Sequence, residues 1–291
     1  MIYKGRSSVE KEWEAFLIRE RRILSQYGVP RESFWKKRLS ALVPEGLSQK
    51  LEAAFIKAFE IVLANGTGLI EKTYARERME LEFQAREYRT SLMPTRKNIR
   101  ENSKRARRQT ACSAAAAGVE GAGLGILGIS LPDIPLFLAS LLRSLYTLCI
   151  QYGIDYDRPE EKKLLLEMIE LSLYQGADFE KRDAALNRKL YELAERDRKR
   201  ILDRGKKGAV PLEKTVERGK NRVSGIVPRD TVRQAAKALS DELLYLKFLQ
   251  GIAVVGVIGG ALNSSCLRRI DRYASLKLER RYLLTRIKLD S

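Results

Sequence analysis

Two long apolar stretches rich in glycine constrain the fold of this 291-residue chain more than any other feature. Residues 111–131 are mostly Ala, Gly, Leu and Ile, with Glu120 as the only charge, and residues 248–267 carry no charge. Each stretch contains a pair of glycines four residues apart, Gly121 with Gly125 and Gly256 with Gly260. Glycine inside a helix costs about 1 kcal/mol relative to alanine. We therefore expect two helices whose glycine faces pack closely enough to offset that cost.

Both stretches are borderline as membrane spans. A helix needs roughly 20 apolar residues to cross a bilayer. The first stretch is long enough, but a charge such as Glu120 near its middle opposes insertion by about 2–3 kcal/mol. The second is strongly apolar only over residues 251–262. Two interpretations stay open: a close-packed buried hairpin, and a segment that inserts into or docks shallowly on a membrane.

Helical periodicity dominates the rest of the chain. Apolar residues recur three or four positions apart, most clearly over residues 47–63, which is the pattern of an amphipathic helix. We expect further helices at residues 8–27, 70–88, 136–150 and 232–249, one beginning at Pro159, and a basic one after residue 267. Residues 65–68 and the pair Tyr152-Gly153 are expected to end helices. The predicted fold is all-α, a multi-helix bundle with the two glycine-rich apolar helices close-packed at its centre.

Composition shifts along the chain divide it into two parts. Pro94 closes an N-terminal helical segment, residues 1–94, and the remaining residues 95–291 form a second helical region. Both parts are expected to pack as one compact unit. Residues 203–228 are highly charged, contain four glycines and have few large apolar side chains, so we expect a flexible connection there.

The absence of histidine excludes much catalytic chemistry. It excludes Ser-His-Asp and Cys-His nucleophiles and any zinc or iron site that uses imidazole. The three cysteines, Cys112, Cys149 and Cys266, stand far apart and form no CxxC spacing, so no metal site, redox motif or cofactor is expected. Such scattered cysteines favour a reducing cytoplasm.

The net charge of +18 is concentrated beside the apolar stretches. One basic cluster precedes the first stretch and another follows the second, and such clusters bind anionic lipid with about 1 kcal/mol per Lys or Arg. The alternative is that these charges are solvated helix faces. Nucleic acid is disfavoured, because no recognised binding motif is present and the glycine pairs would be unexplained. The side chains expected at a membrane surface are Arg100, Lys104, Arg105, Arg107, Arg108, Arg268, Arg269 and Arg272.

Three polar residues lie within or beside the apolar stretches. Asp133 precedes Ile134-Pro135 and suits a helix N-cap, with a ligand or proton-handling role as the alternative. Glu120 could pair with Arg143 or act as an acid, and Asn263 could cap a helix or contact a ligand. We group Asp133 and Asn263 with Gly121, Gly125, Gly256 and Gly260 as candidate lipid- or ligand-binding residues. Asp133 and Glu120 are the weak catalytic candidates.

An ordered set of short motifs resembles the EcsC protein family. The motifs are residues 128–135 (GISLPDIP), 152–155 (YGID), 159–161 (PEE) and 254–263 (VVGVIGGALN), followed by a basic tail. The similarity covers about residues 105–285. One departure is Ala253, where many relatives have proline. The resemblance implies a bacterial, mostly helical protein that is cytoplasmic or peripheral to the membrane. It brings no catalytic residues, and the family name derives from linkage to an ABC transporter operon.

The leading functional hypothesis is a non-enzymatic, membrane-associated protein at the inner face of the cell membrane. Its basic clusters would bind anionic lipid, and its glycine-rich helices would accommodate lipid or insert shallowly. One rival is a histidine-independent enzyme that acts on a lipid or an anionic small molecule through Asp133 and Glu120. The other is a soluble adaptor of a transporter or envelope complex.

Overall fold

The computed structural model describes residues 6–29, 43–116, 133–206, 227–250 and 256–290, and all regular structure in these ranges is helical. This confirms the all-α class. The elements are α1 (Ser8–Leu24), α3 (Leu47–Ile61), the π-helical turn η1 (Val62–Gly66), α4 (Thr67–Glu71), α5 (Arg76–Leu92), α6 (Arg96–Ala116), α7 (Asp133–Gln151), α8 (Pro159–Leu173), α9 (Phe179–Lys206), α11 (Arg229–Gln250) and α12 (Gly256–Asp290).

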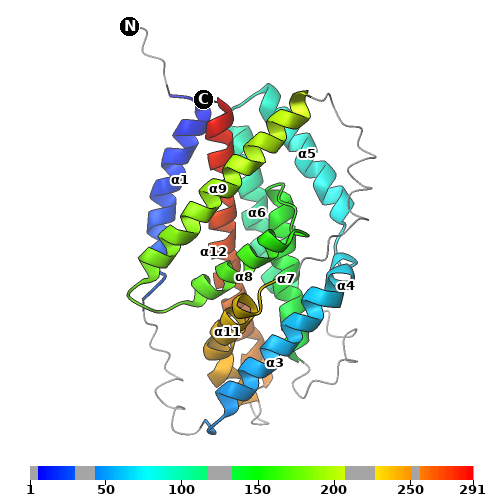
Figure 1. Cartoon of the computed structure of the whole chain (residues 1–291), viewed down its shortest axis with the longest axis vertical. Helices are drawn as coiled ribbons and strands as arrows, with labels where there is room; N and C mark the ends of the chain where they lie inside the picture. The colour runs from blue at the N-terminus through cyan, green and yellow to red at the C-terminus, as the bar shows by residue number, and fades with distance from the viewer. Residues whose placement is uncertain (1–5, 30–42, 117–132, 207–226, 251–255, 291) are drawn as a thin grey trace.

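Helix α12 is the axis of the bundle. It runs through most of the molecule's length and contacts α1, α6, α7, α8, α9 and α11 (Figure 1). The apolar stretch from Gly256 and the basic stretch after Leu267 belong to this one helix. Residues 117–132, which hold the first glycine pair, lie outside the described residues. The close packing of two glycine-rich helices therefore stays a prediction.

A single apolar core joins the two parts that we distinguished in the sequence. Phe16 of α1 and Phe55 of α3 belong to the same buried cluster as Leu141 of α7, Ile169 of α8 and Tyr273 of α12. Helix α7 contributes ten buried apolar residues to this core. Its residues Ile134–Gln151 are long and apolar enough to cross a membrane, but 78% of that window is buried inside the protein. The core helix of a folded protein meets the same criterion, so this is weak evidence for a membrane span.

Most helix ends follow the local sequence signals. Helix α1 begins with a capping box, in which Ser7 and Glu10 each bind the other's backbone N–H. Helix α8 begins at Pro159 with two acidic residues in its first turn, as expected. The predicted break at residues 65–68 is wrong, because the backbone continues from α3 through the π-helical turn into α4. Helix α9 extends to Lys206, so the first four residues of the expected connection 203–228 are helical.

Gly153 ends α7 in a left-handed turn and makes a testable prediction. Its φ is 71°, and the amide of Ile154 donates to the carbonyl of Cys149, which closes the helix end. A Cβ atom here would lie 2.3 Å from Cε1 of Phe83. Gly153→Ala is therefore expected to lower the free energy of unfolding by about 2 kcal/mol or more. Urea denaturation measures this, with Gly46→Ala as the control that has a similar φ but open space. Equal losses in both variants would contradict the contact with Phe83.

Two basic residues of the C-terminal helix are buried and do not face solvent. Lys277 and Arg281 are 0% and 2% exposed and rank among the largest fully buried side chains. The Nζ atom of Lys277 lies 2.7 Å from Oδ1 of Asp183, and Nη1 of Arg281 lies 2.6 Å from Oε2 of Glu161. These two cations of the second basic cluster face protein carboxylates, so they are not available to a membrane.

Candidate functional site

A cavity of about 520 Å³ lies between α1, α6 and α12. Five guanidinium groups line it and only one carboxylate among the described residues does, which gives the lining an excess of four positive charges. The lining residues are Arg19, Ile23, Gln26, Tyr27, Arg107, Arg268, Arg269, Arg272, Ser275, Leu276 and Glu279. We refer to this cavity as the arginine pocket.

The arginine pocket unites the two basic clusters that the sequence places far apart. The residues from α12 recur at spacings of three, four and seven, so one face of that helix forms a wall. Helix α6 starts at the end of the molecule where α12 finishes, and the two helices pack antiparallel (Figure 1). This arrangement brings Arg107 to the same cavity as Arg268 and Arg272, although more than 150 residues separate them in the chain.

Arg269 is held firmly at the edge of the pocket. Its guanidinium lies 4.1 Å from the centre of the Tyr27 ring, and its Nε donates to the carbonyl of Ser172 at 2.7 Å. The Tyr27 hydroxyl in turn donates to the carbonyl of Arg269 at 3.0 Å. Gln26 accepts further bonds from Arg269 through its carbonyl. Arg269 therefore joins the ends of α1 and α8 to α12, which makes it a positioning residue for the pocket.

The other pocket arginines differ in how far they are neutralised. Nη2 of Arg19 lies 2.5 Å from Oε1 of Glu279, so the one lining carboxylate is already paired. Arg272 donates to the side-chain oxygen of Gln26, an uncharged group, at 3.2 Å. No described acidic residue forms an ion pair with Arg107 or Arg272. Their positive charges face the cavity without a carboxylate partner from these ranges.

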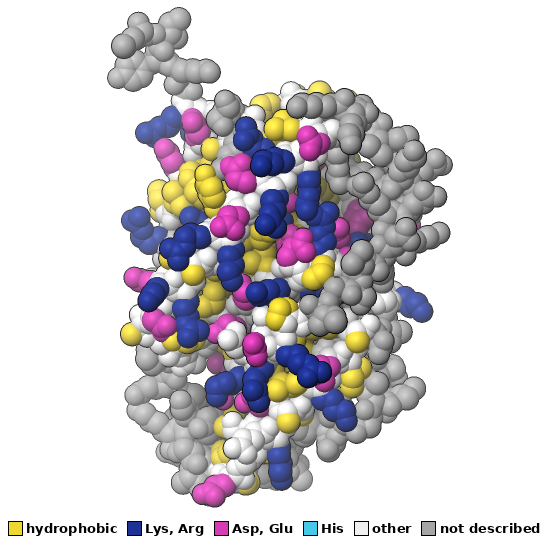
Figure 2. Space-filling model, in the orientation of Figure 1, with side chains coloured by type: hydrophobic (Ala, Val, Ile, Leu, Met, Phe, Trp, Pro, Cys, Tyr) yellow, Lys and Arg dark blue, Asp and Glu magenta, His cyan; other side chains and the backbone are white. Residues whose placement is uncertain are grey.

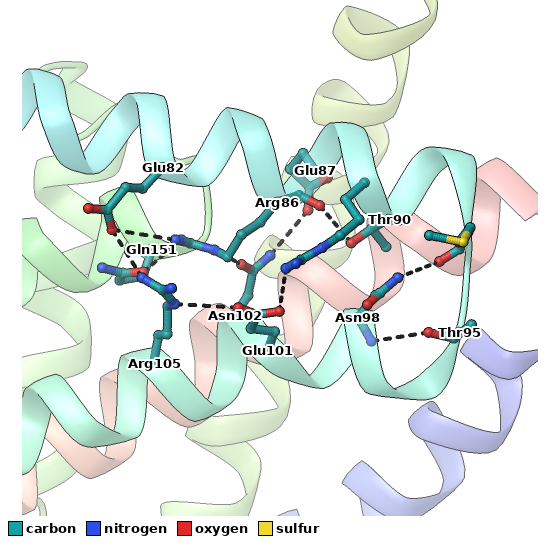
Figure 3. A network of polar contacts seen from close by, with 12 residues as sticks. Glu82, Arg86, Glu87, Thr90, Thr95, Asn98, Glu101, Asn102, Arg105 and Gln151 are labelled. Atoms are coloured by element: carbon teal, nitrogen blue, oxygen red, sulfur yellow. Dashed lines mark hydrogen bonds and ion pairs between the residues drawn. The ribbon is translucent and has the colours of Figure 1, made fainter.

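The rest of the first basic cluster is used mainly to hold helices together. Arg100 donates to Glu12 of α1 at 2.5 Å. Arg105 bridges Glu82 of α5 and Glu101 of its own helix, as Figure 3 shows. Lys104 and Arg108 are exposed. Of these predicted surface residues, only Arg107 enters the pocket.

The large net charge is not evident on the face drawn in Figure 2. Basic and acidic side chains are intermingled there. Two ion pairs between α8 and α9 illustrate the pattern: Arg182 with Glu170 at 2.9 Å and Lys189 with Glu167 at 2.8 Å. Such pairs neutralise the surface locally, so the arginine pocket is a distinct concentration of positive charge.

The remaining candidate residues lie at the starts of α7 and α12 or outside the described residues. Asp133 is the first residue of α7, and Gly256, Gly260 and Asn263 lie in the first turns of α12. The side chains of Asp133 and Asn263 lie outside the described residues, as do Glu120, Gly121 and Gly125 entirely. The cap, ligand and acid roles of these residues stay predictions. Within the described ranges, no group of three His, Cys, Asp or Glu could hold a metal ion.

Sequence reasoning missed the contribution of α1 to the pocket. Arg19 and Ile23 belong to α1, which the sequence identified only by its apolar face, and Gln26 and Tyr27 lie in the turn that follows it. A local signal existed, because residues 19–22 read Arg-Glu-Arg-Arg near the helix end. That signal could not reveal which of these arginines turns toward α12.

Comparison with known proteins places nearly the whole chain in one family. The family model described as "EcsC protein family" matches residues 11–283. This match confirms the resemblance seen in residues 105–285 and extends it to α1, so all lining residues of the arginine pocket lie inside it. A search of curated proteins and a search of solved structures found no match. The chain belongs to the EcsC protein family.

Proposed function

We propose that this protein is membrane-associated and non-enzymatic, and that it binds anionic lipid at the inner face of the cell membrane through the arginine pocket. One observation carries the proposal: arginines from three separate helices line one cavity in which the only described carboxylate is already paired. Guanidinium groups match phosphate oxygens with two parallel hydrogen bonds, so a cavity of this kind suits a phosphate group.

Lipid is favoured over other anions by the composition of the pocket walls. Ile23 and Leu276 line the same cavity as the arginines. An amphiphilic ligand can contact both kinds of lining residue, because its phosphate binds guanidinium groups and its hydrocarbon packs against the apolar side chains. The apolar, glycine-bearing first turns of α12 begin about 18 Å before Arg268, so the apolar stretch and the pocket arginines lie along one helix.

Flotation of vesicles tests this proposal. The protein is expected to float with vesicles that contain phosphatidylglycerol at low salt, to float less at high salt because ions screen the attraction, and to stay behind with neutral vesicles. The triple variant Arg107→Gln, Arg268→Gln, Arg272→Gln removes three exposed positive charges. It is expected to weaken partitioning on the order of 100-fold, from about 1 kcal/mol for each charge.

A matched triple variant separates the pocket from general surface charge. Arg78→Gln, Arg233→Gln, Lys237→Gln removes the same charge from α5 and α11, at side chains that are 80%, 72% and 64% exposed. This control is expected to change partitioning by less than about 3-fold, because each of its charges already has an acidic neighbour. If both triple variants lose the same amount of partitioning, a role for the pocket is contradicted. If the unaltered protein does not bind anionic vesicles, the proposed function is refuted.

A further inference from the structure

We propose that the arginine pocket is a selective site for a phosphomonoester headgroup, a terminal phosphate on a lipid, in preference to a phosphodiester headgroup. This inference rests on the proposed function and adds the chemical class of the ligand. The observations behind it are the number of guanidinium groups, their origin on three different helices, the way they are held, and the size of the cavity.

The charge of the pocket exceeds what a phosphodiester can neutralise. Five guanidinium groups and one carboxylate line it, and that carboxylate is occupied by Arg19. A phosphodiester carries one negative charge and two non-bridging oxygens. A phosphomonoester carries a charge of about −1.5 to −2 at neutral pH and three acceptor oxygens. The second negative charge of a phosphomonoester therefore strengthens binding in a pocket where several cations surround the phosphate.

The origin of the arginines on separate helices favours a ligand with three acceptor oxygens. Arg107 reaches the cavity from α6, whereas Arg268 and Arg272 reach it from α12. Each guanidinium is a planar fork of donors that binds two oxygens. A terminal phosphate has three oxygens with which to accept hydrogen bonds from guanidinium groups of both helices at once. A diester has one free oxygen fewer and less negative charge, so it offers fewer and weaker contacts to guanidinium groups from two helices.

Protein contacts orient the arginines before a ligand arrives. Gln26 accepts from Arg272 through its side chain and from Arg269 through its carbonyl. The Tyr27 ring supports Arg269, and Glu279 holds Arg19. Side chains that are already ordered lose less entropy on binding, so contacts of this kind increase both affinity and selectivity.

The size and walls of the cavity indicate that the phosphate is attached to a lipid. A volume of about 520 Å³ is in the range of small-molecule sites and exceeds the needs of a phosphate ion. Ile23 and Leu276 provide apolar contact for the first carbons beyond the phosphate. A soluble phosphomonoester leaves these side chains without an apolar partner, so it is expected to bind more weakly than the corresponding lipid.

Partitioning onto vesicles of equal surface charge tests the selectivity. The full chain is mixed with phosphatidylcholine vesicles that contain phosphatidic acid or phosphatidylglycerol, with mole fractions adjusted until the measured zeta potentials agree. Binding is expected to be about 10-fold tighter on phosphatidic acid. The variant Arg107→Gln, Arg272→Gln is expected to reduce this ratio to near one. The control Arg78→Gln, Arg233→Gln is expected to keep it.

Each other outcome identifies what has failed. Equal binding of the unaltered protein to both charge-matched vesicles overturns the selectivity but leaves the proposed function standing. No binding to either vesicle overturns the proposed function itself. Glycerol 3-phosphate is added as a soluble competitor, and its displacement of the protein from phosphatidic acid vesicles at micromolar concentration would overturn the lipid part of the inference. Equally potent displacement by double-stranded DNA would overturn the phosphomonoester class.

Discussion

Replacing Arg281 by methionine is expected to lower the free energy of unfolding by about 3–5 kcal/mol. Arg281 of α12 is almost fully buried and donates to both carboxylate oxygens of Glu161, at 2.6 and 2.8 Å. Its Nε also donates to Asp197 at 2.7 Å. Burial alone would lower the pKa of Arg281. The hydrogen bonds and charges of Glu161 and Asp197 outweigh burial, so the pKa lies above the ordinary value for arginine. Methionine would leave the buried carboxylate of Glu161 without its cation.

Urea denaturation of two further variants isolates the cause of this loss. Arg200→Met removes an arginine that lies 3.7 Å from the same Asp197 but is 43% exposed, and it is expected to cost less than about 1 kcal/mol. The double variant Glu161→Leu, Arg281→Met removes both charges and is expected to recover much of the stability. If the double variant is less stable than Arg281→Met, packing by Glu161 and not its charge determines the effect.

Asp271→Asn is expected to stabilise the protein at neutral and higher pH. Asp271 of α12 is 1% exposed, accepts a hydrogen bond from Ser144 at 2.7 Å, and its Oδ1 has no partner among the described residues. Burial raises the pKa of Asp271 to about 7. The unfolded chain ionises near pH 4, so ionisation increasingly favours the unfolded state as the pH rises from 4 to 7. Above pH 7 this loss levels off at about 4 kcal/mol.

The pH dependence distinguishes this effect from simple repacking. Asparagine retains an acceptor for Ser144 but places an amide where Oδ1 lacks a partner, which costs about 1–3 kcal/mol. The variant is therefore expected to be no more stable than the unaltered protein at pH 4 and about 2 kcal/mol more stable at pH 8. The measurement is urea denaturation at several pH values. A stability difference that does not change between pH 4 and 8 would contradict the raised pKa.

Local sequence signals predicted those parts of the fold that depend on neighbouring residues. Gly153 ends α7 because its left-handed turn suits glycine, and Pro159 begins α8 because proline needs no helical N–H partner there. The helix break predicted at residues 65–68 is absent because packing against a distant helix outweighs the local signal. Glycine and asparagine weaken a helix there by amounts that packing can overcome, and α3 and α4 both pack against α7.

The arginine pocket could be predicted only in part. Both basic clusters were evident from the sequence, and Arg107, Arg268, Arg269 and Arg272 were among the residues singled out. The sequence could not reveal that Arg100 and Arg105 bind carboxylates of α1 and α5, because those partners lie 88 and 23 residues away. Nor could it reveal that α1 completes the pocket.

The sequence by itself determined the helical class, the family and the residue types available for chemistry. Periodicity, caps and composition act over a few residues, and the absence of histidine holds in any fold. Only the tertiary structure decided the role of each charge. Arg281 and Arg268 lie thirteen residues apart on one helix, yet one is buried against Glu161 and the other lines an exposed pocket. The reason is that a charge's environment depends on partners from distant helices, such as Glu161, 120 residues away.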